Sequence, residues 1–165
     1  MSAYVSDTHA PVIASLGAKF DHVAHAARTI TELLPLYRDT LGGRFTTGAA
    51  SEDLGFRTVH MTYEDGSKIE LLDALPGSTF LDSFLERQPL GGLHHVTFRV
   101  DDLDRALEAA AAAGLETFGM NRDRPKWHEF FIHPRIAGGV LVQIAQAADD
   151  FPPPTSGTIE EFLAS

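Results

Sequence analysis

Alternation of apolar and polar residues predicts four main elements in the first half of the chain. They are a strand at 20–26, a helix at about 29–41, and strands at 56–63 and 68–73. The first strand is short and mildly alternating, as is typical of a half-buried strand. Thr29 and Glu32 form the pattern of a capping box at the helix start, and Gly42 with Gly43 predicts its end. Pro35 fits this helix only in or near the first turn, where its missing N–H costs little.

The second half repeats this order of elements. It has a predicted strand at 93–100, a helix at 103–113, and strands at 129–133 and 140–146. Asp102 is placed to cap the helix and Gly114 to end it. A short helix at 78–87 is predicted to link the halves, and Pro89 marks their boundary. Each half is therefore a strand, a helix, and two or three further strands.

These elements indicate one domain built from two half-units. The expected boundaries are a leader at 1–19, a domain at 20–147 with half-units 20–74 and 93–147 and a linker at 75–92, and a polar, Pro-rich tail at 148–165. At 165 residues the chain is long enough to bury a core. A small helix is expected near 159–163, and its Phe162 and Leu163 could pack on the domain or on a partner.

The two halves are related by a constant offset of 73 residues. His22 and His95 are separated by this offset, and so are Glu70 and Gln143. The flanking residues keep the register without a gap: Asp21 falls on His94, Val23 on Val96, Phe45 on Phe118, His60 on His133 and Gly66 on Gly139. Two copies of one unit would meet across a pseudo-two-fold axis, each offering one His and one Glu or Gln. Two imidazoles with two oxygen donors are a suitable first shell for a divalent cation.

Composition narrows the chemistry further. Hydrophobic residues make up 44% of the chain and charged residues 22%, as in ordinary soluble globular proteins. The formal net charge of -10 argues against nucleic acid or an anionic membrane as the partner, so a small-molecule substrate is expected. The chain has no Cys, and any metal ligands must therefore be His, Asp, Glu, Asn or Gln. Neither an apolar run of membrane-spanning length nor an N-terminal signal pattern is present, so a cytoplasmic protein is expected.

Several short segments together resemble one known superfamily. They are 20–23 (FDHV), 36–42 (LYRDTLG), 68–72 (KIELL), 92–102 (GLHHVTFRVDD) and 132–142 (IHPRIAGGVLV). In order and spacing they resemble the vicinal oxygen chelate superfamily, which includes glyoxalase I, the bleomycin-resistance proteins and the extradiol dioxygenases. Within it they look most like the methylmalonyl-CoA epimerases. The resemblance runs from Phe20 to about Ala147.

The resemblance implies an α+β fold in which two βαβββ units form an eight-stranded, incompletely closed barrel around a metal ion. His22, Glu70, His95 and Gln143 match the ligand positions of the superfamily. Such ligands accept Co, Ni, Zn, Mn or Fe. The implied activity is that of a metal-dependent isomerase or epimerase, or a lyase, which chelates a carbonyl or carboxylate substrate and transfers its α-proton. An acyl-CoA thioester is the named candidate substrate, and a homodimer is expected because members often pair.

The chain departs from the epimerase pattern at its proton carriers and in one loop. The epimerases have Glu where this chain has Gln143, and an amide can offer oxygen to a metal but cannot act as a base. Their other acid/base matches Glu52, so Glu52 and Glu70 are the predicted proton carriers on the two faces of the substrate. Residues 121–128 are expected to form a loop that replaces a Gly-rich lid with bulk and positive charge, which indicates a different substrate.

Other functions and other roles for these residues stay open from sequence. Gln143 is compatible with a metal-free binding or resistance protein, and Glu70 could supply the carboxylate of a non-heme iron dioxygenase. Symmetric core packing is the structural alternative to ligation by the paired histidines. His60 and His133 are expected to pair strands or line a pocket rather than bind metal, and His94 is expected to have no chemical role.

Overall fold

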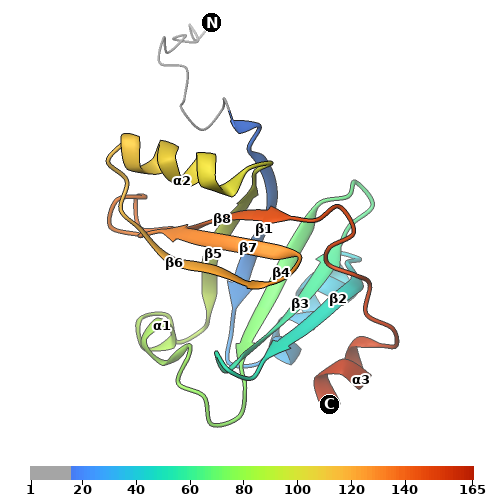
Figure 1. Ribbon diagram of the computed structural model, residues 1–165. Coiled ribbons are helices and arrows are strands. Elements are labelled where there is room, and N and C mark those ends of the chain that lie inside the picture. The colour runs from blue at the N-terminus through green and yellow to red at the C-terminus, as the bar shows by residue number, and fades with distance from the viewer. Residues whose placement is uncertain (1–15) are drawn as a thin grey trace, which may run out of the picture. The chain divides into compact units, whose positions relative to one another are not determined.

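The structure is a computed structural model that describes residues 16–165 (Figure 1). Its contacts divide the chain into two compact units. The larger unit contains residues 21–97 and 149–165, and the smaller unit contains 98–148 together with 16–20. Most of the predicted leader, residues 1–15, lies outside the described residues. Within residues 16–165, no helix is both long and apolar enough to cross a membrane.

The elements follow one another as two sets of strand, helix and three strands, as the repeat predicts. The first set is β1 (Lys19–Ala26), a 3-10 helix η2 (Ile30–Glu32), a π-helix η3 (Pro35–Thr40), β2 (Arg44–Ser51), β3 (Phe56–Thr62) and β4 (Lys68–Ala74). After α1 (Asp82–Arg87), the second set is β5 (Gly92–Arg99), α2 (Leu103–Ala112), β6 (Thr117–Arg124), β7 (Trp127–Ile132) and β8 (Leu141–Ala147). A last helix, α3 (Ile159–Ala164), ends the chain.

The larger unit is built on strands in the order β2-β3-β4-β1-β5. β3 is antiparallel to β2 and β4, whereas β1 is parallel to β4. One face of these strands packs on the helices that follow β1. The buried side chains of this core include Ala27, Ile30, Leu33, Leu34, Val59, Met61, Ile69, Leu71 and Ile159. Burial of this apolar surface fixes which face of β3 and β4 is left for polar side chains.

The helical segment after β1 begins differently from the prediction. The expected capping box of Thr29 and Glu32 does not form, because the Thr29 side chain makes no cap hydrogen bond. The Glu32 N–H donates to the Thr29 backbone oxygen instead. The Ile30 N–H donates to the buried Asp73 carboxylate at 2.9 Å, and Asp73 also pairs with Arg57 at 2.9 Å. A tertiary contact thus satisfies the first N–H of this segment. Pro35 lies in the first turn of η3, as predicted.

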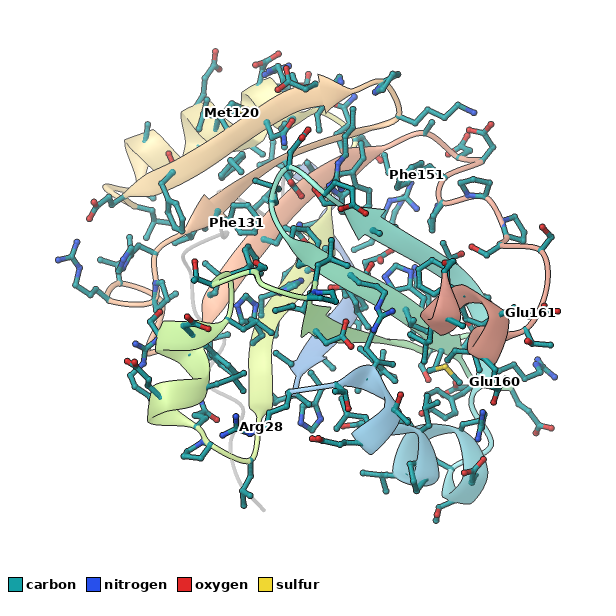
Figure 2. The ribbon with its side chains drawn as sticks, turned by 90° about the horizontal axis from the view of Figure 1, so that it is seen from below. Arg28, Met120, Phe131, Phe151, Glu160 and Glu161 are labelled. Atoms are coloured by element: carbon teal, nitrogen blue, oxygen red, sulfur yellow. The ribbon has the colours of Figure 1, made fainter. Side chains whose placement is uncertain are left out.

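The C-terminal segment packs on the larger unit. Ile159 of α3 is buried in its core, and the ring of Phe162 lies 6.1 Å from that of Phe45. Glu161, labelled in Figure 2 on α3, forms a capping box with Thr158. The tail therefore packs on the domain itself, which is one of the two placements left open by the sequence, and the predicted helix near 159–163 is confirmed.

The smaller unit contains α2 and strands in the order β8-β7-β6, all antiparallel. α2 lies against these strands (Figure 1), and its small side chains allow close packing. Asp102 caps α2 through the Arg105 N–H, as predicted, and Gly114 follows the helix at φ 71°. The core consists of Leu16, Val100, Leu103, Ala106, Ala109, Ala110, Phe130, Ile132 and Ile144.

Two strands were not read directly from the sequence. β2 (Arg44–Ser51) is mostly half-exposed and contains Gly48, so its apolar alternation is weak. β6 (Thr117–Arg124) is similarly exposed. The prediction of a loop at 121–128 is wrong, because this segment comprises the end of β6, a tight turn and the start of β7. Arg124 pairs directly with Trp127 across that turn.

Candidate metal centre

A buried carboxylate in the larger unit lies close to three imidazole rings. Glu70 is on β4 and is 9% exposed. One carboxylate oxygen, Oε2, lies 3.0 Å from His60 Nε2 and 3.9 Å from His22 Nε2. The other, Oε1, lies 3.6 Å from His95 Nε2. We call these four residues the Glu70 cluster.

Strand geometry explains how residues far apart in the sequence reach this point. His60 on β3 is the direct partner of Glu70 in the β3–β4 ladder. His22 on β1 lies two residues before Ala24, which is the β1 partner of Glu70, so His22 and Ala24 share a face. The ring centroid of His22 is 5.0 Å from that of His60 and 5.8 Å from that of His95 on β5. Central strands β1, β4 and β5 thus carry the three predicted ligands of the larger unit.

Polar neighbours fix the orientation of two of the imidazoles. His22 Nδ1 lies 2.7 Å from the Asp21 carboxylate, which Lys68 Nζ also contacts at 2.9 Å. His22 therefore carries its proton on Nδ1 and presents Nε2 toward Glu70 and toward Thr97 Oγ1 at 3.1 Å. Such a carboxylate–histidine pair is the usual support of a metal-bound imidazole.

His95 is also held by the residue that precedes it, but by an imidazole instead of a carboxylate. Its Nδ1 lies 3.0 Å from Nδ1 of His94, whose ring packs edge-on against Phe84. His94 therefore has an orienting role that the sequence prediction did not assign. In the repeat, Asp21 and His94 are equivalent positions, so each half supports its histidine with the preceding residue.

The protonation states in the Glu70 cluster suit metal binding. Burial alone would raise the pKa of Glu70, but the hydrogen bond from His60 and the electrostatic interactions with His22, His95 and His60 lower it to about 2. Burial lowers the pKa of His95 to about 4, against the opposing effect of Glu70. Burial also works against ionised Asp21, yet its hydrogen bonds with His22 and Lys68 hold its pKa well below the usual range. Near neutral pH the cluster presents a carboxylate and a neutral His95, which are the ligand forms that a metal requires.

One atom of the cluster shows a specific fit to a cation. His95 Nε2 is buried and has no hydrogen-bond partner. A buried polar atom without a partner costs free energy, and coordination of a metal would satisfy it. The ligand atoms of His22, His60 and Glu70 all lie within 4.8 Å of one another, which is the spacing of a group that could hold a metal ion. Imidazole and carboxylate donors suit Zn, Co, Ni, Mn or Fe.

The fourth predicted ligand, Gln143, is in the smaller unit. It is 8% exposed on β8, directly opposite Phe131 of β7. Its Nε2 donates to Glu129 Oε2 at 2.5 Å, and the same oxygen accepts from Trp127 Nε1 at 2.6 Å. Ligation by Gln143 stays a prediction. Glu129 was not singled out from sequence, although a lone Glu between apolar residues of a strand is a usable signal.

The predicted proton carriers occupy different environments. Glu70 is in the Glu70 cluster, whereas Glu52 is exposed in the turn after β2. Phe56, at the near end of β3, is four residues from His60, so about 13 Å of strand separates this turn from the cluster. The structure thus brings Glu52 near neither Glu70 nor the histidines within this unit, and its role stays a prediction.

Comparison with known proteins identifies the family of this chain. A model of the Glyoxalase/Bleomycin resistance protein/Dioxygenase superfamily matches residues 21–131. The chain belongs to this superfamily. The resemblance inferred from its motifs is thereby confirmed.

The individual relatives that this superfamily member matches include several epimerases. An ethylmalonyl-CoA/methylmalonyl-CoA epimerase from Cereibacter sphaeroides is 30% identical over 131 residues, covering 78% of this chain and 97% of that protein. A mitochondrial methylmalonyl-CoA epimerase from Dictyostelium discoideum is 29% identical over 141 residues, covering 82% of each. The crystal structure of methylmalonyl-CoA epimerase from Mycobacterium tuberculosis matches with a TM-score of 0.70 at 26% identity, over 79% of this chain and 89% of that one. The predicted glyoxalase-like α+β fold is confirmed.

Proposed function

We propose that the protein is a divalent-metal-dependent epimerase that transfers the α-proton of a CoA thioester related to methylmalonyl-CoA. The observation that carries this proposal is the convergence of three imidazole nitrogens on the Glu70 carboxylate, at 3.0, 3.6 and 3.9 Å. Epimerases align with this chain over most of their length, which supports the reaction class. The relatives' names supply the substrate class.

His22, Glu70 and His95 are the proposed protein ligands, with Gln143 as the fourth. A divalent ion bound to such donors polarises a substrate carbonyl and stabilises the negative charge that develops when the α-proton leaves. Asp21 and His94 hold the imidazoles in the tautomers that coordination needs. His60 donates to Glu70 and holds that carboxylate in place.

Epimerisation removes a proton from one face of the α-carbon and delivers a proton to the other face, so two carriers are needed. Glu70 and Glu52 are the proposed carriers. Glu70 is buried and ionised, so it is in the unprotonated form that can accept a proton. Glu52 is exposed in the turn after β2 and is proposed as the second carrier because it matches the other acid/base position of the epimerases.

Solvent exchange of the α-proton tests this proposal. Wild-type protein loaded with Co²⁺ should incorporate deuterium from D₂O at the α-carbon of methylmalonyl-CoA, as followed by NMR. Glu70→Ala and Glu52→Ala should each lose this exchange, whereas Glu64→Ala, a change in an exposed turn, should keep it. Unchanged exchange in both site variants would remove the assigned carriers.

A second function has one specific observation in its favour. His22, His60 and Glu70 form a set of two histidines and one carboxylate, which is the donor set of non-heme iron oxygenases. If the protein were a dioxygenase, Fe(II)-loaded protein would consume oxygen with a catechol and would not exchange the α-proton of a CoA thioester. An oxygen electrode and the exchange assay therefore separate the two functions.

A further inference from the structure

The smaller unit contains a buried carboxylate to which the proposed function gives no role. Glu129 on β7 is 8% exposed. Its Oε2 accepts two hydrogen bonds, from Gln143 Nε2 at 2.5 Å and from Trp127 Nε1 at 2.6 Å. Both donors are themselves buried. A carboxylate held by two buried donors is a fixed group rather than a solvated one.

The position of Glu129 on its strand makes this contact rigid. Trp127, Glu129 and Phe131 alternate along β7 and share one face, whereas Phe130 and Ile132 point into the core under α2. Phe131, labelled in Figure 2, is the ladder partner of Gln143, and Glu129 is the partner of Ala145. Glu129 and Gln143 are therefore diagonal neighbours on adjacent paired strands, and the ladder holds their backbones at a fixed spacing.

This contact determines which way the Gln143 amide faces. An amide has one end that only donates and one that only accepts, and an ionised carboxylate only accepts. The nitrogen of Gln143 must therefore face Glu129, and its carbonyl oxygen must face away from it. Without Glu129, the two orientations of the amide would differ far less in energy. A metal can use only the orientation that presents oxygen.

The same contact explains why an amide, and not a carboxylate, suits position 143 in this chain. A glutamate there would place an acceptor against the acceptor oxygen of the buried Glu129. Exchanging the two residue types between positions 129 and 143 would again pair a hydrogen-bond donor with an acceptor. A glutamine at 129 can accept from Trp127 through its oxygen and donate to a glutamate at 143 through its nitrogen.

We propose that Glu129 is a positioning residue that fixes the Gln143 side chain as an oxygen donor. Trp127 completes the arrangement by holding the Glu129 carboxylate from the other side. The proposal rests on the role of Gln143 as a metal ligand in the proposed function. It assigns to Glu129 the task that Asp21 performs for His22, namely to hold a ligand in one orientation.

Two measurements on the full chain test this role. In metal-free protein, the side-chain NH₂ signals of Gln143 in ¹⁵N NMR should be protected from hydrogen exchange. Glu129→Ala should lose this protection, whereas Glu129→Gln, which keeps an acceptor, should retain it. Titration with Co²⁺ should show affinity reduced about 10- to 100-fold in Glu129→Ala and by less than about threefold in Glu129→Gln. In a Gln143→Ala background, Glu129→Ala should have no further effect on Co²⁺ affinity.

A double variant, Glu129→Gln with Gln143→Glu, which we call the swapped pair, tests the same role if Glu129→Ala fails to fold. Gln143→Glu should lower the thermal midpoint of the metal-free protein, and Glu129→Gln combined with Gln143→Glu should restore it. Equal Co²⁺ affinity in wild type and Glu129→Ala, or equal losses in Glu129→Ala and Glu129→Gln, would overturn the positioning role. If wild-type protein binds no Co²⁺, the proposed function fails, and the amide protection and the swapped pair still decide the orientation of Gln143.

Discussion

The two hairpins β3–β4 and β7–β8 occupy equivalent places in the repeat but pair their residues differently. His60 and Glu70 are direct ladder partners in the first hairpin. Their equivalents at an offset of 73 residues are His133 and Gln143, yet Gln143 pairs with Phe131, two residues before His133. The two halves therefore align in sequence without a gap, but equivalent residues do not pair with equivalent partners across the two hairpins. In the β3–β4 hairpin the His60 imidazole contacts the Glu70 carboxylate, whereas in the β7–β8 hairpin the Glu129 carboxylate contacts the Gln143 amide.

Proline and the longer turn explain the difference. β7 ends at Ile132, directly before His133 and Pro134, and a proline has no N–H to continue the ladder. The turn up to β8 then includes Gly138 and Gly139, both at positive φ. His133 instead accepts from the Arg135 N–H and packs beside Phe118. Of the two equivalent residues, His60 therefore belongs to the Glu70 cluster and His133 lies in a turn.

The largest expected effect is loss of the carboxylate that the three imidazoles share. Glu70→Ala should reduce Co²⁺ affinity by more than about 100-fold, beyond the range of supporting residues, because it removes the carboxylate that lies beside all three imidazoles. Isothermal titration of wild-type and variant protein measures this. Gln143→Ala, the equivalent change in the other half, should have a smaller effect, since it removes a neutral donor. Equal losses would show that the halves contribute equally.

The next effect separates the two repeated histidines. His60→Ala should weaken Co²⁺ binding about 10- to 100-fold, because Glu70 loses the hydrogen bond that holds it. His133→Ala is the matched control and should leave the Co²⁺ affinity within about twofold of wild type. If both variants bound as wild type does, the ladder pairing of His60 with Glu70 would have no functional meaning.

A smaller effect distinguishes the residues that precede the two predicted ligands. Asp21→Ala should weaken Co²⁺ binding about 10-fold, since it removes the carboxylate that orients His22. His94→Ala should have only a few-fold effect, because a neutral ring supports His95 less strongly. The circular dichroism of both variants controls for folding. A larger loss in His94→Ala than in Asp21→Ala contradicts this order.

The last effect is of a different kind and concerns the pH dependence of the free energy of unfolding of the metal-free protein. The pKa of His95 falls from 6.5 to about 4 on folding, so as the pH is lowered His95 is protonated in the unfolded chain before it is protonated in the folded protein. Stability should therefore decrease as the pH falls below 6.5, by about 1 kcal/mol at pH 6 and about 2 kcal/mol at pH 5. The lowered pKa of Glu70 adds a further loss between about pH 4.5 and 2. Urea unfolding of wild type and His95→Gln measures this, and the variant should show a clearly smaller decrease between pH 6.5 and 5. Burial also lowers the pKa of His94 and of His25, and these two residues account for the decrease that stays.

The sequence predicted the parts of this molecule that depend on local pattern. The strands at 20–26 and 68–73, the cap at Asp102 and the helix near 159–163 all follow from alternation or capping residues. The repeat and the family motifs together singled out His22, Glu70 and His95, which the structure brings together.

The remaining features depend on tertiary pairing. Thr29 does not cap its helix through its side chain: the Glu32 N–H donates to the Thr29 backbone oxygen, and the Ile30 N–H donates to Asp73, 43 residues away. The repeat predicts the same role for His60 and His133, to pair strands or line a pocket, but the contact of His60 with Glu70 depends on the strand register of one hairpin only. Glu129 has meaning only beside Gln143 and Trp127, which the β7–β8 register brings within reach.

The most direct test of the central claim is deuterium incorporation into methylmalonyl-CoA by wild-type protein stripped with a chelator, assayed with and without added Co²⁺. The account predicts α-proton exchange with Co²⁺ and none in the stripped protein. Equal exchange in the stripped protein, or none with Co, Ni, Mn, Fe or Zn, would contradict it.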